Sequence, residues 1–127
     1  MIEKEKVLKI IKDNDESRNE TKELRNNDKV YNWSESRIKL CEFIAALPSD
    51  ELWDLLALMD YGREILPFHK QPEFTEFIKF RKNIETEELT VDNKKNKAAY
   101  MLAKRDFSKY LTAVLPIYNF SDFKFKR

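Results

Sequence analysis

The strongest hydrophobic pattern in the chain lies in SDELWDLLALMDYGREILP, which runs from Ser49 to Pro67. Its apolar residues recur at the spacing of a helix face and then widen until little polar surface remains. A helix that is apolar over most of its circumference usually has neighbours on several sides. We therefore expect a central helix over residues 49–66, with Ser49 as its N-cap and Asp50 and Glu51 in its first turn.

Weaker helical periodicities flank this segment on both sides. Ser34 is placed as the N-cap of a helix that ends before Pro48, and Pro72 suits the first turn of a later helix. Residues 94–115 carry two runs of helical spacing, which form either one continuous helix or two helices with Asp106 as the cap of the second. The apolar positions expected on the core side of these helices are Ile38, Cys41, Ile44, Phe74, Phe77, Ile78, Ala98, Met101, Leu102, Phe107, Leu111 and Val114.

The two ends of the chain are more polar and less regular. Residues 1–29 predict a peripheral helix or a mobile arm, because Leu24 is the only aliphatic residue in 13–29. Residues 116–127 form a tail that mixes aromatic and basic side chains. Together these patterns predict an all-α protein, with one domain over residues 1–127 in which about five helices form a compact bundle around the central helix.

Three residues of the central helix are expected to have structural roles. Gly62 either adopts the left-handed conformation that ends the helix or lets a neighbouring helix approach closely. Arg63 is expected to form a bridge to a neighbouring helix. Trp53, together with Trp33 and the phenylalanine-rich tail, offers more aromatic surface than a small core requires, which favours self-association into a homo-oligomer.

Composition agrees with an all-α fold and argues against several kinds of active site. The chain has one glycine among 127 residues, so it cannot form the glycine-rich loop that binds phosphate groups or dinucleotides. Cys41 is the only cysteine and His69 the only histidine, so a zinc site lacks its usual set of about four ligands. Cys41 is expected in the core and His69 in a connector, which argues against a nucleophilic pair. We therefore expect no catalytic residue, no cofactor and no metal, and a protein that is not an enzyme.

No part of the sequence resembles a signal peptide or a membrane-spanning segment. The first residues are charged throughout, and the apolar stretch around Trp53 contains Asp54 and Asp60 and is too short to cross a bilayer. A single cysteine excludes an intrachain disulfide, which fits a reducing compartment. These observations predict a cytoplasmic protein without a membrane partner.

The formal net charge of +1 conceals a strong asymmetry along the chain. Residues 1–92 carry 15 basic and 21 acidic side chains, whereas residues 93–127 carry 9 basic and 2 acidic ones. Two interpretations are open: the halves attract each other, within one fold or between subunits, or the basic half binds an anionic partner. The first is the simpler interpretation, because a charged helix face is usually only solvated.

The basic half contains the residues most suited to binding such a partner. A basic face is expected on residues 94–109, on the side of a helix opposite Tyr100 and Phe107, and the C-terminal tail would extend it. A face of this kind contacts phosphates with little sequence preference, although it matches no helix-turn-helix or RNA-binding signature. The residues of this candidate surface are Lys94, Lys97, Lys104, Arg105, Lys124, Lys126 and Arg127.

The segment from Asp54 to Arg63, DLLALMDYGR, resembles the signature of a bacterial family known as a domain of unknown function. That signature reads acidic-Leu-x-Ala-Leu-Met-x-x-Gly-Arg, follows a Leu-Pro segment and precedes Ala-x-Tyr-Leu and Tyr-Leu helices. The matching segments here are LP at 47–48, AAYML at 98–102 and YL at 110–111, while Val114 stands where the family has a glycine. The resemblance covers roughly residues 38–115 and implies a small helical domain, but it implies no activity.

Two functions from different classes fit these observations. We prefer a non-enzymatic helical module that binds another protein, as an adaptor or inhibitor of a larger bacterial or phage machine. The richness of the chain in Lys, Asn, Ile and Glu suits an AT-rich genome of that kind. The alternative is a nucleic-acid-binding protein that uses the basic face on residues 94–109 together with the C-terminal tail.

Overall fold

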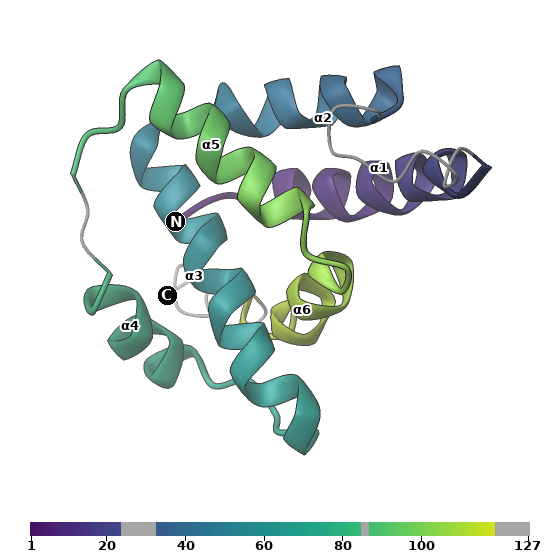
Figure 1. Cartoon of the computed structure of the whole chain (residues 1–127). Helices are drawn as coiled ribbons and strands as arrows, with labels where there is room; N and C mark the ends of the chain where they lie inside the picture. Colours follow the sequence, from purple (N-terminus) through teal and green to yellow (C-terminus); the bar gives the residue numbers. More distant parts are fainter. Residues whose placement is uncertain (24–32, 85–86, 119–127) are drawn as a thin grey trace.

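The computed structural model describes residues 1–23, 33–84 and 87–118, and this part of the chain contains six α-helices and no strand (Figure 1). The predicted all-α fold is confirmed, and the helix count exceeds the predicted five because residues 94–115 form two helices. The helices are α1 (Lys4–Glu23), α2 (Glu35–Ala45), α3 (Ser49–Ile65), α4 (Phe74–Lys82), α5 (Val91–Leu102) and α6 (Phe107–Val114), with a 3-10 turn, η3 (Leu66–Phe68), after α3.

The helix α3 lies at the centre of the bundle, as its apolar pattern predicts. It packs against α6, α4 and α5, while α1 packs against α2 and α6, and α2 against α5 (Figure 1). A helix with three packed neighbours needs an apolar surface on several sides. The buried apolar side chains of α3 are Leu52, Trp53, Leu55, Ala57, Leu58, Met59, Tyr61 and Ile65.

The start of α3 differs from the prediction. Pro48 rather than Ser49 is the N-cap, and no side chain caps the helix there. Ser49 is the first helical residue, and its hydroxyl donates to Glu88 Oε1 and accepts from the Leu89 backbone N–H, each at 3.0 Å. The serine therefore connects α3 to the segment before α5, and these partners are too distant in the sequence to be predicted from a capping pattern.

Gly62 lies inside α3 and lets α6 approach closely. A Cβ atom at this position would lie 2.1 Å from the carbonyl oxygen of Tyr110 and 2.7 Å from its carbonyl carbon. Atoms in packed protein interiors do not come that close, so no side chain fits there. Of the two roles predicted for Gly62, the structure shows the close approach: its φ is not positive, and the helix continues to Ile65.

The N-terminal segment forms one long helix, α1, whose second half is polar but partly buried. Asn14 and Ser17 are each about 1% exposed, and both contact Arg37 of α2. The Arg37 Nη1 group donates to Asn14 Oδ1 at 2.9 Å and to Ser17 Oγ at 3.0 Å. Polar packing around a buried arginine therefore takes the place of an apolar stripe. The remainder of the predicted arm, 24–29, lies outside the described residues.

The orientation of α2 also differs from the prediction. Ile38, which was expected on the core side, is 47% exposed, whereas Arg37 is 2% exposed. Burying a guanidinium group is costly unless its donors find partners, and α1 and α5 supply those partners. Ser34 is the N-cap of α2 as predicted, since its hydroxyl accepts from the Arg37 backbone N–H at 3.3 Å.

The turn at 103–106 separates α5 from α6. Thr90 caps α5, because its hydroxyl accepts from the Asn93 backbone N–H at 3.2 Å. Asp106 is the N-cap residue of α6, as predicted for two separate helices, but its side chain makes no capping hydrogen bond. Its carboxylate instead forms an ion pair with Lys109 at 3.8 Å.

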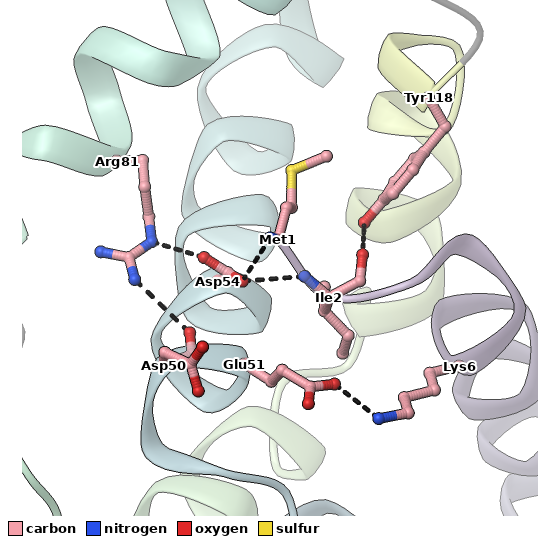
Figure 2. A network of polar contacts seen from close by, with 8 residues as sticks. All are labelled: Met1, Ile2, Lys6, Asp50, Glu51, Asp54, Arg81 and Tyr118. Atoms are coloured by element: carbon pink, nitrogen blue, oxygen red, sulfur yellow. Dashed lines mark hydrogen bonds and ion pairs between the residues drawn. The ribbon is translucent and has the colours of Figure 1, made fainter. Parts of the chain in front are cut away.

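Asp54 of α3 connects the start of the chain to α4 (Figure 2). Its Oδ2 accepts from the Ile2 backbone N–H at 2.8 Å, and its Oδ1 accepts from Arg81 Nε at 2.7 Å. The Tyr118 hydroxyl donates to the Ile2 carbonyl at 3.1 Å, which adds the segment after α6 to this network (Figure 2). Asp54 is 7% exposed, so these bonds to a charged group are made largely away from water and are stronger than neutral ones.

Candidate interaction surface between α3 and α5

The predicted basic face does not lie on a single helix. Its first two lysines are in α5, but α5 ends at Leu102, and Lys104 and Arg105 belong to the turn that leads to α6. The prediction of one helical face over residues 94–109 is therefore wrong. At this end of α5, arginines from α1 and α2 both donate to the carbonyl of Leu102, one of the last carbonyl groups that have no partner within the helix. Three members of the predicted face lie outside the described residues: Lys124, Lys126 and Arg127.

Part of the basic face lines the contact between α5 and α3. Side chains three and four residues apart share one side of a helix, which brings Lys97, Tyr100 and Lys104 together at one flank of α5 and its following turn. The Lys97 ammonium contacts Trp53 of α3, and the charge of Lys104 acts on Asp60 of the same helix. We define the seam surface as Trp53, Asp60 and Arg63 of α3 with Lys97, Tyr100 and Lys104.

Trp53 is a buried side chain at one end of the seam surface, and its contacts fix its position. The tryptophan is 8% exposed, and its indole N–H donates to the Glu87 carbonyl at 2.9 Å. The Lys97 Nζ atom lies 4.5 Å from the centre of the indole ring, within the range of a cation–π contact. Trp53 therefore has a structural role, and it does not provide the free aromatic surface on which the prediction of self-association partly rests.

An exposed aromatic ring lies between the two lysines of the seam surface. Tyr100 is 47% exposed, and the Lys104 Nζ atom lies 4.4 Å from the centre of its ring. Lys97 and Lys104 thus each contact an aromatic ring, which limits the positions that their long side chains sample. The result is a partly exposed aromatic side chain that the Lys104 ammonium contacts, while Lys97, three residues earlier in α5, contacts Trp53 instead.

The other end of the seam surface contains an acid, Asp60. Arg63 pairs with it, Nη2 to Oδ1 at 3.3 Å, so Arg63 contacts its own helix rather than bridging to another as predicted. The Asp60 Oδ1 atom is buried and accepts no hydrogen bond from any described residue. Burial raises the pKa of Asp60, and the positive charges of Arg63 and Lys104 oppose that increase.

Among the described residues, the cations of α5 and its following turn form no close ion pair with the acidic part of the chain. The ion pairs that join different elements use basic groups from the first 92 residues, such as Lys6 with Glu51 and Arg81 with Asp54. In the described range 87–118, Lys109 is the one basic side chain that lies within 4.0 Å of a described carboxylate. Close ion pairing between the two halves therefore does not account for the charge asymmetry of the described chain.

Two arginines, the buried Arg37 and the half-buried Arg18, bond the backbone beside Lys104. Arg37 Nη2 donates to the Leu102 carbonyl at 2.7 Å, and Arg18 Nη2 donates to the carbonyls of Leu102 and Lys104 at 2.8 and 2.6 Å. No described carboxylate forms an ion pair with either guanidinium group. Burial, followed by the charge of Arg18, lowers the pKa of Arg37 to about 10. Both arginines thus hold the turn that carries Lys104.

Sequence reasoning did not identify these arginines, although one signal for Arg37 exists. Arg37, Leu40 and Ile44 follow the spacing of a single helix face, and all three are buried in α2. The sequence pattern places Tyr100 opposite the basic face, and this is wrong for Lys104, which lies over the Tyr100 ring. No pattern in the sequence brings Asp60 to the same surface. That placement depends on the packing of α5 against α3, which joins distant parts of the chain.

The described residues outside the seam surface give little support for a catalytic or metal-binding site. Cys41 is half-buried, and burial raises the pKa of its thiol, which disfavours the nucleophilic thiolate. His69 is exposed at the end of η3, where its φ is 53°. Within the described ranges, no group of three or more His, Cys, Asp or Glu side chains could hold a metal ion. A groove of about 290 Å³ lies between α1 and α2, with Leu40 and Phe43 in its lining, and Lys9 and Asp13 form an ion pair along its α1 side.

None of the helices in the described part of the chain has the length and apolar content needed to cross a membrane.

Comparisons of the chain with known protein families, with curated proteins and with solved structures found no match. The resemblance to a family of unknown function therefore stays a prediction.

Proposed function

We propose that the protein is a non-enzymatic helical module that binds another protein through the seam surface, as an adaptor or inhibitor of a larger bacterial or phage machine. The observation that carries this proposal is the exposed ring of Tyr100 between Lys97 and Lys104. Both ammonium groups contact aromatic rings, and neither lies within 4.0 Å of a described carboxylate. An exposed aromatic side chain near lysines that form no ion pair with a described carboxylate is the kind of surface that an acidic protein partner would complete.

The physical basis of this proposal is the cost of ordering an interface. Aromatic residues are frequent anchors of protein interfaces, and polar groups form the surrounding rim. Lysines normally lose much side-chain freedom when they bind, which reduces affinity. Lys97 and Lys104 are already restricted by Trp53 and Tyr100, so less freedom remains to be lost. The seam surface is therefore partly organised before any partner arrives.

A pull-down with the tagged full chain from a nuclease-treated bacterial lysate tests the proposal. The test variant combines Lys97→Glu with Lys104→Glu, and the control combines Lys12→Glu with Lys79→Glu, which are exposed on α1 and α4. Both variants change the net charge equally, and circular dichroism checks that each is folded. We expect a protein captured by the wild type and by the control to be lost with the test variant. Equal capture of that protein by all three would exclude the seam surface as its binding site.

Nucleic-acid binding is the second candidate, and the unneutralised cations of α5 and its following turn are the observation that favours it. Lys94, Lys95 and Arg105 add to the charge of Lys97 and Lys104 in this region. Such a surface would bind phosphates with an affinity that falls steeply as the salt concentration rises. Material that is captured without nuclease and lost after nuclease treatment would favour this candidate over a protein partner.

A further inference from the structure

The seam surface contains one acid among its cations, and its interaction with the neighbouring arginine is incomplete. The contact of Asp60 with Arg63 is a single one of 3.3 Å, and the Asp60 Oδ1 atom accepts no hydrogen bond from a described residue. A guanidinium group has five N–H donors. The Arg63 side chain is 48% exposed and donates no hydrogen bond within the described ranges, so most of its donors remain available to a ligand.

We propose that Asp60 is an internal competitor for the ligand of the seam surface, and that this ligand is an acidic polypeptide segment whose carboxylate replaces Asp60 as the partner of Arg63. This inference rests on the proposed function, because it assigns a partner chemistry to the same surface. An external carboxylate can approach a guanidinium group in its plane and accept two parallel N–H bonds, which the present contact with Asp60 does not achieve. Lys104, whose charge acts on Asp60, would attract the same incoming group.

The charge pattern favours spaced carboxylates over the phosphates of a nucleic acid. Duplex DNA carries one negative charge per about 1.7 Å of its axis, so it would bring phosphates close to Asp60 and the exposed Glu64 as well as to the cations. A polypeptide can place one acidic side chain on Arg63 and an apolar one on Tyr100, so that only a single negative charge comes near Asp60. An acid within the surface thus selects against dense negative charge.

Fluorescence anisotropy with the full chain tests this inference with two probes. One probe is a fluorescein-labelled peptide of glutamate, leucine and alanine, and the other is a labelled double-stranded DNA. Asp60→Asn removes the competing charge at nearly constant shape. Glu35→Gln is the matched control, because Glu35 also pairs with a cation of its own helix, Lys39, at 3.4 Å. We expect Asp60→Asn to bind the peptide about threefold more tightly than the wild type, while Glu35→Gln binds as the wild type does.

Arg63→Gln provides the second arm of the experiment, since the gain from Asp60→Asn should disappear when both changes are combined. Unchanged or weaker peptide binding by a stably folded Asp60→Asn would overturn the inference, as would a gain that persists without Arg63. A gain with the DNA probe alone would show that the ligand class is wrong. If Asp60→Asn does not fold, Asp60→Ser provides the same comparison.

Different results would contradict the proposed function and this inference. If the variant with Lys97→Glu and Lys104→Glu binds the peptide and the lysate partner as the wild type does, the seam surface is not a binding site. If that variant loses binding while Asp60→Asn gains nothing, the surface is retained as the site and Asp60 is not a competitor. Thermal unfolding of each variant shows whether its change in binding has a structural origin.

Discussion

The absence of a side chain at Gly62 sets how closely α3 and α6 pack. The space that a Cβ atom would occupy is taken by the Tyr110 carbonyl group. Gly62 stands out in the sequence as the only glycine of the chain. The sequence cannot decide between a helix end and a close approach, however, because the deciding atom belongs to a helix much later in the chain.

We expect Gly62→Ala to lower the free energy of unfolding by about 3 kcal/mol, because α3 and α6 must move apart to admit a methyl group. A decrease in stability would be informative, because alanine inside a helix is normally more favourable than glycine by about 1 kcal/mol. Urea denaturation measures the change. Glu42→Ala, at an exposed position of α2, is the control and should change stability by less than about 0.5 kcal/mol. Wild-type stability of Gly62→Ala would contradict the packing described here.

Individual helices are predicted well because their signals are local. The helix α3 spans Ser49–Ile65 against a predicted 49–66, and the hydroxyl of Ser34 caps α2 as expected. The orientation of α2 is not predicted, because Arg37 counts as polar in any hydrophobic pattern. Its burial depends on acceptors in α1 and at the end of α5, which no local window contains.

We expect Asp54 to hold the start of the chain and α4 against α3, although the sequence does not reveal these contacts. Replacing Asp54 with asparagine should lower the free energy of unfolding by about 2 kcal/mol, because Arg81 and the Ile2 N–H lose a charged acceptor that is mostly buried. A double-mutant cycle with Arg81→Gln should give a coupling of about 1 kcal/mol or more.

The exposed pair of Glu35 and Lys39 on α2 serves as the comparison for that cycle. Its coupling should be about 0.5 kcal/mol or less, because both groups remain solvated. A coupling between Asp54 and Arg81 no larger than that of the exposed pair would mean that the buried network does not hold α4 to α3.

At the scale of the whole molecule, the candidate site arises where α5 packs against α3 (Figure 1). The sequence identifies Lys97, Lys104 and Arg63 one by one as residues of interest. It cannot join them into one surface, because the contact between the two helices is a long-range property of the fold. The same limit applies to the split of the predicted basic face, which follows from the end of α5 at Leu102.

The alkaline stability of the whole protein should depend on Tyr118. Burial, and then the charge of Asp54, raise the pKa of its hydroxyl above the ordinary value of 10.0. The folded protein therefore retains the phenolic proton at a pH where the unfolded chain releases it, so stability is lost as the pH rises above 10. The pKa of Tyr61 is also raised on folding, so its ionisation likewise lowers stability as the pH rises. Arg37 has the opposite effect, because its pKa is lowered on folding and its contribution to stability therefore increases as the pH rises.

The variant Tyr118→Phe isolates this contribution. Near neutral pH it should be less stable than the wild type by about 1 kcal/mol, since the Ile2 carbonyl loses its hydrogen bond. Above pH 10 the difference should shrink, because the variant has no buried phenol to ionise. Denaturant titrations on both sides of that pH measure the effect, with the exposed Tyr100→Phe as the control. A difference that stays constant with pH would contradict the burial of the Tyr118 hydroxyl.

The two arginines that bond the end of α5 also change the charge that an approaching ligand meets at that end. The peptide dipoles of a helix give its C-terminal end a partial negative charge, which would attract cations and repel an acidic ligand. In this protein Arg18 and Arg37 both donate to the Leu102 carbonyl at that end. An acidic ligand that approaches Lys104 would therefore meet a helix end whose partial negative charge is opposed by two guanidinium groups.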